Sequence, residues 1–405
     1  MRTPPPELLM QVSNDPSAEN YRNVGMVRWA VEQPLIAAGY RFADFDRILD
    51  FGCGVGRLLQ ALQQVRREGQ ELFGCDVNAA CAGWCKENLD FANVEHTALE
   101  PPLPYADERF DLITAISVFT HLSRPLQIAW ARELMRILRP GGVALVTTVG
   151  MGFLPDVFRI NDRWNVREYA LLGASGSFFH FAESQASALE GQREVIALHA
   201  NDAVAQIFSP LRIVRRIEIS PIAAGQDASV IVKPKSGCSV ITAAGSSQGA
   251  SGMAAEVPTD GTTSNLVTLR FDSDYKGPAR LRAYVAMAER RYDLVNLAVE
   301  CRISDSSSGR LVALVRLAFP TTVALGPDHY IPFTVDFEST PTIEVSLSLV
   351  LSRAPWQSAP IAFRWWDVRI EVGSDRISAT ADRRTRVESS LAAEMVATEP
   401  TIVRH

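Results

Sequence analysis

A glycine-rich turn between a buried strand and a helix is the feature that most constrains how this chain folds. Residues 47–60 read RILDFGCGVGRLLQ: an apolar run, three glycines at alternate positions, then an amphipathic helical pattern. Glycine lacks a Cβ atom and tolerates positive φ, so such a backbone turns sharply and comes close to a ligand. The turn also directs the free N–H groups of the helix N-terminus at that ligand. The segment therefore predicts a strand, a ligand-binding turn and a helix, in that order.

Short apolar runs alternate with amphipathic helical patterns from residue 47 to about 150. This alternation is typical of a parallel sheet whose two faces are covered by helices. RIVRRIEIS and ASVIVKP then predict an antiparallel strand pair. The first part of the chain is thus expected to be a doubly wound, mostly parallel α/β domain. The aromatic-rich residues 151–200 are expected to form loops and short helices over the mouth of the sheet.

The length of the chain requires a second domain. Its 405 residues exceed the roughly 250 to 300 at which a single core usually stops growing. Many β-type runs separated by turn signals follow residue 265, which favours a mainly β sandwich. The expected organisation is an α/β domain at 1–235, a Ser/Gly/Ala-rich linker at 236–264, the sandwich at 265–373 and a polar tail at 374–405.

Charge and composition exclude several classes of protein. The net charge of -6 argues against a general binder of nucleic-acid phosphates, which would carry a basic stripe. The six cysteines form no CxxC pair, so we expect reduced thiols and no metal. The sequence has neither a signal-type N-terminus nor an apolar run of ~18 residues. We therefore expect a cytoplasmic protein without a membrane span.

Two positions near the turn separate the cofactor classes. A dinucleotide-binding G-x-G-x-x-G motif starting at Gly52 would need glycine at 57, where the chain has Arg57. A dehydrogenase is therefore disfavoured. Asp76 lies 20 positions after Gly56, where a second strand should end. A carboxylate there can accept two hydrogen bonds from a ribose diol, and the alternative is that Asp76 caps a helix.

Four motifs in order resemble the class I S-adenosylmethionine-dependent methyltransferases, which have a Rossmann-like fold. They are LDFGCGVGR, the acid Asp76, LPYADERFDLITAISVFTHL and LMRILRPGGVALVTT. The resemblance covers residues 21–234. It implies a seven-stranded sheet with the last strand antiparallel, and S-adenosyl-L-methionine as the cofactor.

The same resemblance implies roles for the residues of the turn. Asp50 would orient the amino group of the cofactor through the turn. Gly52, Gly54 and Gly56 would line its methionine portion.

The remaining cofactor contacts implied by the resemblance follow later strands. Asp76 would hold the ribose, and Val77 would pack on the adenine. Ala98 and Leu99 would flank the adenine edge, while Ser117 would sit below the sulfonium. The alternative for the apolar residues among these is simple core packing, since small apolar residues at strand ends are usually buried.

Methyl transfer requires mainly alignment from the protein, because the sulfonium is already a strong electrophile. A hydroxyl acceptor would also profit from a general base. His121 in SVFTHL follows the fourth strand, at the end of the sheet where ligands of doubly wound folds bind. We expect His121 to be the base, with loop capping as the alternative. His180 and Tyr21 are weaker candidates from neighbouring segments.

The second domain leaves its role open. AFRWWDVRIEVG loosely resembles the last strand of jelly-roll modules in carbohydrate-binding proteins. Trp365 and Trp366 should point to opposite faces of one strand, so at most one belongs to the core. Either the sandwich helps to bind the acceptor, or it serves assembly, including a homo-oligomer, or stability.

We therefore expect a methyltransferase that acts on an oxygen of a small molecule or glycan. An Asn/Asp-Pro-Pro-Tyr motif of amino-group methylators is absent, because PPLPY at 101–105 follows Glu100 and contains an extra leucine. Two alternatives stay open. One is a cofactor-binding scaffold without turnover, and the other is a methyltransferase acting on protein or nucleic acid.

Overall fold

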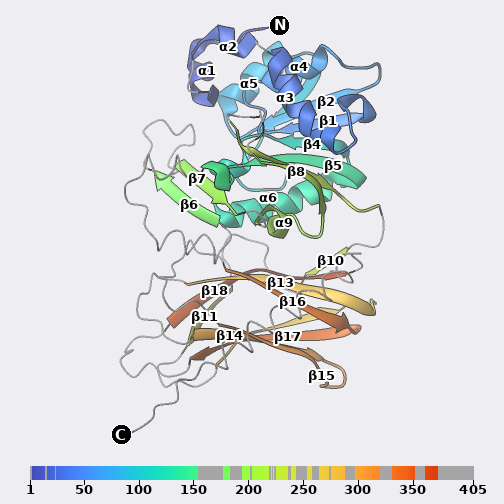
Figure 1. Ribbon diagram of the computed structural model, residues 1–405, viewed down its shortest axis with the longest axis vertical. Helices are drawn as coiled ribbons and strands as arrows, with labels where there is room; N and C mark the ends of the chain where they lie inside the picture. The colour runs from blue at the N-terminus through green and yellow to red at the C-terminus, as the bar shows by residue number, and fades with distance from the viewer. Residues whose placement is uncertain are drawn as a thin grey trace.

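The computed structural model combines an α/β domain with a β-sandwich (Figure 1). Both parts of the expected fold class are confirmed. The predicted polar tail at 374–405 lies outside the described residues. The structure describes residues 2–13, 16–22, 24–153, 177–182, 194–200, 203–218, 220, 222, 225–235, 239–242, 253–257, 264–272, 275–287, 297–318, 331–351 and 361–372.

A seven-stranded sheet forms the centre of the first domain. Its strands are β1 (Arg47–Phe51), β2 (Glu71–Asp76), β3 (Ala92–His96), β4 (Phe110–Ala115), β5 (Leu138–Thr148), β8 (Arg212–Ile217) and β9 (Asp227–Val232). They lie in the order β3-β2-β1-β4-β5-β9-β8, and β9, the last of these seven strands along the chain, runs antiparallel to both of its neighbours. The predicted topology is confirmed. The direction of winding reverses between β1 and β4, which places a ligand crevice at the carboxyl ends of these two strands.

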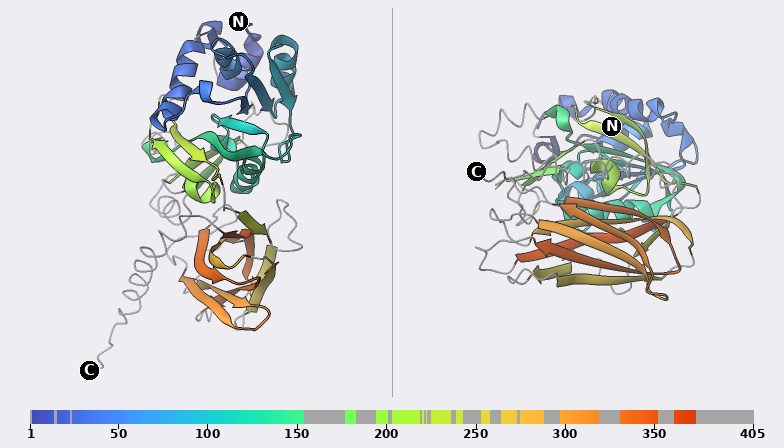
Figure 2. Two further views of the ribbon diagram at one scale, coloured as in Figure 1. Left: turned by 90° about the vertical axis from the view of Figure 1, so that its right-hand side faces the viewer. Right: turned by 60° about the horizontal axis from the view of Figure 1, so that its bottom comes forward.

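Helices cover both faces of this sheet, because successive buried side chains of β5 point to opposite faces and each face needs a covering layer. Val143 and Leu145 are buried with α3, α4 and α5, whereas Ala144 and Val146 are buried with α6 and α9 (Figures 1 and 2). No described helix is both long and apolar enough to cross a membrane. The helices and 3-10 turns of this domain are α1 (Pro6–Ser13), α2 (Ala18–Arg22), α3 (Val24–Ala37), η1 (Phe42–Asp44), α4 (Arg57–Gln63), α5 (Ala79–Asn88), η2 (Phe119–His121), α6 (Arg124–Ile137), η3 (Met151–Phe153) and α9 (Ala203–Ile207).

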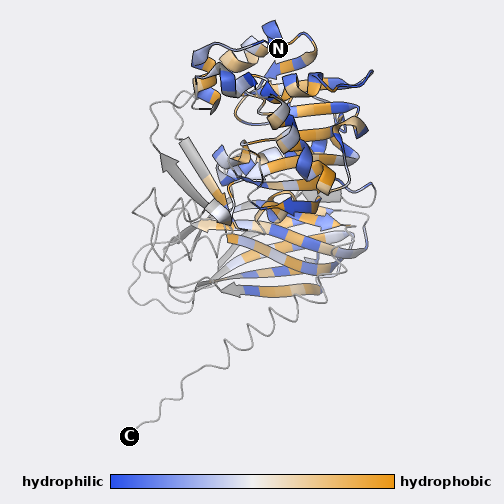
Figure 3. Ribbon diagram, turned by 45° about the horizontal axis from the view of Figure 1, so that its top comes forward, coloured by the Kyte–Doolittle hydropathy of each residue, from blue (hydrophilic) through white to orange (hydrophobic). Residues whose placement is uncertain are grey.

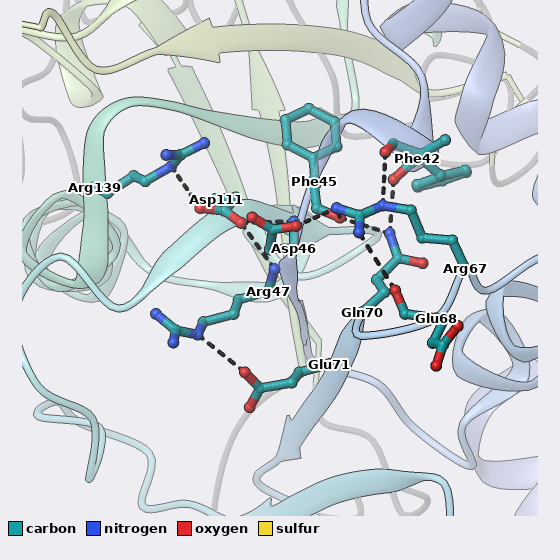
Figure 4. A network of polar contacts seen from close by, with 11 residues as sticks. Phe42, Phe45, Asp46, Arg47, Arg67, Glu68, Gln70, Glu71, Asp111 and Arg139 are labelled. Atoms are coloured by element: carbon teal, nitrogen blue, oxygen red, sulfur yellow. Dashed lines mark hydrogen bonds and ion pairs between the residues drawn. The ribbon is translucent and has the colours of Figure 1, made fainter.

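A polar network joins the amino ends of the parallel strands, on the side of the sheet away from the ligand crevice (Figure 4). One carboxylate oxygen of Asp111 accepts from the N–H groups of Asp46 and Arg47 at 2.7 and 2.8 Å. Its other oxygen pairs with Arg139 at 2.5 Å. Because a buried charge is costly unless it is paired, this arrangement anchors the strand starts away from the ligand crevice.

Among the described residues of 151–200, where loops and short helices are expected, the structure has one 3-10 turn, η3, and a strand pair. β6 (Ser177–Ala182) and β7 (Glu194–His199) form an antiparallel pair, and β7 packs against η2 and β5. The expectation was wrong for these residues because aromatic residues favour strands as well as loop packing.

The second domain is a sandwich of two antiparallel sheets. One has the order β10-β18-β13-β16 with β11 also on β18, and the other has the order β12-β17-β14-β15. Side chains of both sheets share one core, in which Trp365 is fully buried. Alternating apolar and polar residues along these strands account for this arrangement (Figure 3). The strands are β10 (Ser239–Thr242), β11 (Met253–Val257), β12 (Ser264–Asp272), β13 (Gly277–Met287), β14 (Leu297–Asp305), β15 (Leu311–Ala318), β16 (Ile331–Ser339), β17 (Thr342–Leu351) and β18 (Ile361–Val372).

Two strands lie inside the range 236–264 that the composition marks as a linker. Both β10 and β11 pair with β18, more than a hundred positions later in the chain. The interpretation of this range as linker alone is therefore corrected. Ser, Gly and Ala are typical of linkers, but pairing with a strand from elsewhere overrides local composition.

Candidate active site

A pocket of about 640 Å³ opens at the carboxyl ends of β1 and β4, where the strand order reverses. Its size lies within the range of pockets that hold small molecules and cofactors. Most of the site residues expected from the sequence line it, and they come from the four segments at the carboxyl ends of β1, β2, β3 and β4. They are Gly52, Gly54, Asp76, Val77, Ala98, Leu99, Ser117 and His121.

The glycine turn comes as close to the pocket as the sequence implies. Gly52 has φ of 75°, and a Cβ atom at this position would lie 2.3 Å from Cγ2 of Val118. Gly56, by contrast, does not line the pocket. It precedes α4 in the left-handed conformation, and a Cβ atom there would meet Leu89, so the structure places it at the start of the helix; its contact with the methionine portion stays a prediction.

Asp76 ends β2, and two backbone N–H groups fix its carboxylate. Oδ2 accepts from Gly54 N–H at 2.7 Å, and Oδ1 accepts from Asn78 N–H at 2.8 Å. The cap of α5 is Asn78, whose side chain accepts from Ala80 and Cys81, so the helix-cap alternative for Asp76 loses its support. Burial raises the pKa of Asp76, and the two N–H groups oppose that rise. A carboxylate offers about four lone-pair sites, so acceptor capacity remains for a ligand hydroxyl.

Asp50 lies beneath the turn and does not line the pocket. Its side chain is 4% exposed and accepts a hydrogen bond from Thr114 Oγ1 at 2.8 Å. Burial raises the pKa of Asp50 to about 7, and the negative charge of nearby Asp76 adds to the rise. A contact with the cofactor's amino group would therefore act through the turn, as the resemblance implies.

Asp50 makes the stability of the unliganded protein depend on pH. Its pKa is near 4 in the unfolded chain and about 7 in the folded one, so the folded state keeps a proton that the unfolded state has lost. Stability should fall as pH rises through this window and level off above it. Between pH 5 and 8 the loss should be on the order of 2 to 3 kcal/mol, and Asp50→Asn should remove it. Urea unfolding across this range tests the expectation; parallel curves for both proteins would contradict it.

Ser117 follows β4 with φ of 58°, which is uncommon for a residue other than glycine. Its N–H donates to Thr147 Oγ1 at 2.8 Å, and its Oγ accepts from Gln226 Nε2 at 2.9 Å. Thr147 in turn donates to Gln226 Oε1 at 2.7 Å. The side chains of Thr147 and Gln226 thus hold Ser117 at the pocket. Neither Thr147 nor Gln226 is singled out by the sequence, because each makes contacts that are remote along the chain.

Helix α6 supplies a wall of the pocket that the sequence analysis missed. Leu126 and Trp130 line it, and Trp130 Nε1 donates to the carbonyl oxygen of Leu99 at 2.9 Å. Helix α1 contributes from the other end of the chain. An amphipathic pattern marks α6 in the sequence but gives no sign of which ligand it faces. The lining residues not predicted are Gln11, Val12, Phe51, Cys75, Thr97, Ile116, Val118, Leu122, Ser123, Leu126 and Trp130.

His121 is the last residue of η2, is exposed and lines the pocket. It therefore meets the positional requirement for a group that faces an acceptor. Tyr21 does not: it is buried, and its hydroxyl donates to the carbonyl oxygen of Val55 at 2.8 Å. The side chain of His180, on β6, lies outside the described residues.

Fold and site together define a class I S-adenosylmethionine-dependent methyltransferase domain in the first part of the chain. Residues 49–146 match the family described as methyltransferase domain. This match spans the glycine turn, Asp76, the strand before Ser117, and β5.

Two curated relatives match part of this chain. Methyltransferase GfsG of Streptomyces halstedii is 32% identical over 157 residues, which cover 36% of this chain and 50% of that protein. Probable tRNA methyltransferase 9B of Homo sapiens is 33% identical over 104 residues, covering 24% of this chain and 20% of that protein. The chain thus spans half or less of the length of these relatives. Among solved structures, the PH0226 protein from Pyrococcus horikoshii OT3 is 13% identical and covers 56% of this chain and 95% of its own, with a TM-score of 0.38.

Proposed function

We propose that this protein transfers a methyl group from S-adenosyl-L-methionine to an oxygen atom of a small molecule or glycan. The observation that carries the proposal is a single pocket that brings the glycine turn, Asp76 and His121 together. The residues fit the cofactor, because the absence of a side chain at Gly52 keeps open the space beside Val118 at the turn. A Cβ atom at this position would collide with Val118, which also lines the pocket. When bound, the cofactor supplies an electrophilic methyl group.

The protein's own residues supply binding and alignment. The carboxylate of Asp76 would accept hydrogen bonds from the ribose hydroxyls, and Val77, Ala98 and Leu99 offer apolar surface along the next part of the pocket. Ser117, held by Thr147 and Gln226, would position the reacting end. Fixing donor and acceptor in line supplies much of the rate enhancement.

An acceptor hydroxyl must lose its proton as it attacks the methyl group. His121 is the group we propose to accept that proton, because it is exposed at the pocket and belongs to a turn that β7 supports. The net charge of -6 disfavours a nucleic-acid acceptor. We propose that residues of the first domain bind the acceptor, since one face of the sandwich already packs against α6.

Cofactor binding provides the direct test. Titration calorimetry should show binding of S-adenosylmethionine and S-adenosylhomocysteine and no binding of NAD. Asp76→Ala should weaken binding by about 1.5 to 3 kcal/mol, the range for a hydrogen bond to a charged group. Asp76→Asn keeps one carbonyl acceptor, so its affinity for the cofactor should lie between those of the wild-type protein and Asp76→Ala. NAD binding without either sulfur cofactor would overturn the proposal, and an unchanged affinity in Asp76→Ala would remove Asp76 from the site.

A measurement of methyl transfer distinguishes an active methyltransferase from a scaffold that only binds the cofactor. A screen with labelled S-adenosylmethionine against sugars, lipids and small aromatic alcohols should identify a methylated oxygen. Affinity for the cofactor without turnover on any acceptor class, including protein and tRNA, would favour the scaffold instead.

A further inference from the structure

One face of helix α6 lines the pocket, and another contacts the sandwich. Leu126 and Trp130, four positions apart, line the pocket. Arg124, Ile128 and Arg132 also follow at intervals of four, on a face that meets the sandwich. Figure 1 shows α6 between the central sheet and strands β13 and β18. The helix that walls the pocket is therefore also the helix on which the second domain rests.

The contact between α6 and the sandwich is partly apolar. Ile128 packs with Tyr284 and Ala286 of β13, and all three are buried. The guanidinium of Arg124 lies 5.5 Å from the centre of the Tyr284 ring. A cation over an aromatic face is attracted to the ring, more strongly where water is excluded.

A buried charged network continues this contact. Arg132 of α6 forms an ion pair with Asp367 of β18, whose other oxygen pairs with Arg369 at 2.5 Å. Arg369 also donates to the carbonyl oxygen of Ser209, just after α9, at 2.6 Å, and Ser209 Oγ donates to Glu371 at 2.7 Å. The side chains of Asp367, Arg369 and Glu371 are only 1 to 2% exposed. We call Arg132, Asp367, Arg369, Glu371 and Ser209 the interdomain network.

The backbone of β18 is shaped to present this network. Asp367 has φ of 50°, and the register against β13 shifts between Arg282 and Tyr284. This bulge sets Asp367 toward Arg132 while Trp365 and Val368 stay in the sandwich core. Bulges of this kind re-aim side chains, and a left-handed residue other than glycine persists only where its surroundings hold it.

We propose that the β-sandwich is a positioning element of the cofactor site, acting through the interdomain network on helix α6. Packed protein interiors yield little, so a shift of the Arg132 face of α6 moves the Trp130 face with it. Trp130 Nε1 donates to Leu99 O, so such a shift also reaches Leu99, a second residue that lines the pocket. Arg132 and Asp367 are positioning residues and touch no part of the pocket. This positioning role rests on the proposed function in one respect: the ligand of the pocket is taken to be S-adenosylmethionine or its product.

The test uses the full chain and Asp367→Asn, with two measurements on each protein. Amide hydrogen exchange over residues 124–137 should become faster, and the dissociation constant for S-adenosylhomocysteine, measured by calorimetry, should rise roughly two- to thirtyfold. Glu300→Gln is the matched control, because it removes an ion pair with Arg316 on the other sheet of the sandwich. The control should change neither quantity, although it also weakens a sandwich contact.

Arg132→Met provides a second variant if Asp367→Asn does not fold. It leaves Asp367 paired with Arg369, so the sandwich keeps its own network while α6 loses the link. A folded variant with unchanged exchange in α6 and unchanged affinity would overturn the proposal. If the wild-type protein does not bind S-adenosylhomocysteine, the proposed function fails, and the exchange of α6 alone decides the positioning role.

Discussion

Replacement of His121 by alanine is expected to lower the rate of methyl transfer by about a hundred- to ten-thousandfold. This is the usual contribution of a general base, and His121 lies at the pocket where an acceptor hydroxyl would meet the methyl group. The affinity for S-adenosylhomocysteine should stay nearly unchanged, because the imidazole would face the acceptor and not the ribose. Single-turnover kinetics with the acceptor found by screening, combined with calorimetry, measure both quantities.

His121→Gln is the matched control for this prediction. Glutamine keeps hydrogen-bonding capacity but cannot accept the proton, so it should be nearly as slow as alanine. Near-normal turnover in the glutamine variant would show that His121 orients the acceptor or the η2 turn and that the proton leaves by another route.

Gly52→Ala is expected to abolish detectable cofactor binding and to destabilise the first domain by about 2 to 5 kcal/mol. Two costs add: roughly 1 to 2 kcal/mol for a side chain at positive φ, and about 1 to 3 kcal/mol for overpacking against Val118. The overlap is direct, because the added Cβ would lie 2.3 Å from Cγ2 of Val118. Calorimetry and urea unfolding measure the two effects.

A double variant separates these two costs, and a glycine with open space around it serves as the control. Gly52→Ala combined with Val118→Ala should recover part of the stability, since the overlap is relieved and only the backbone cost stays. Gly83→Ala, in the middle of α5 with open space around it, should stabilise by about 0.5 to 1 kcal/mol. Equal losses in the single and double variants would show that the contact with Val118 has no part in the effect.

The central sheet could be predicted because its signals are local. The apolar runs at β1, β4 and β5 and the turn at Gly52 each depend on fewer than about a dozen neighbouring residues. Asp76 follows from its spacing to the turn. These features account for the fold class and for one side of the cofactor pocket.

The remaining parts of the site depend on contacts that local patterns do not encode. The hydrogen bonds that join Ser117 to Thr147 and to Gln226 span 30 and 109 positions. A threonine in a strand and a glutamine in a turn look ordinary in the sequence. The strands β10 and β11 were missed for the same reason, since their partner β18 lies at the far end of the second domain.

The position of Gln226 orders the steps by which the first domain forms during synthesis. Strands β1 to β5 leave the ribosome before β9, which must then insert between β5 and β8. Until that moment β5 presents an open edge, and unpaired strand edges are the sites of mispairing and aggregation. Long-range pairing of this kind also slows folding. A nascent chain halted before residue 226 would thus carry a complete glycine turn beside a Ser117 that is bonded to Thr147 but lacks the hydrogen bond from Gln226, so this wall of the pocket is completed only when β9 is in place.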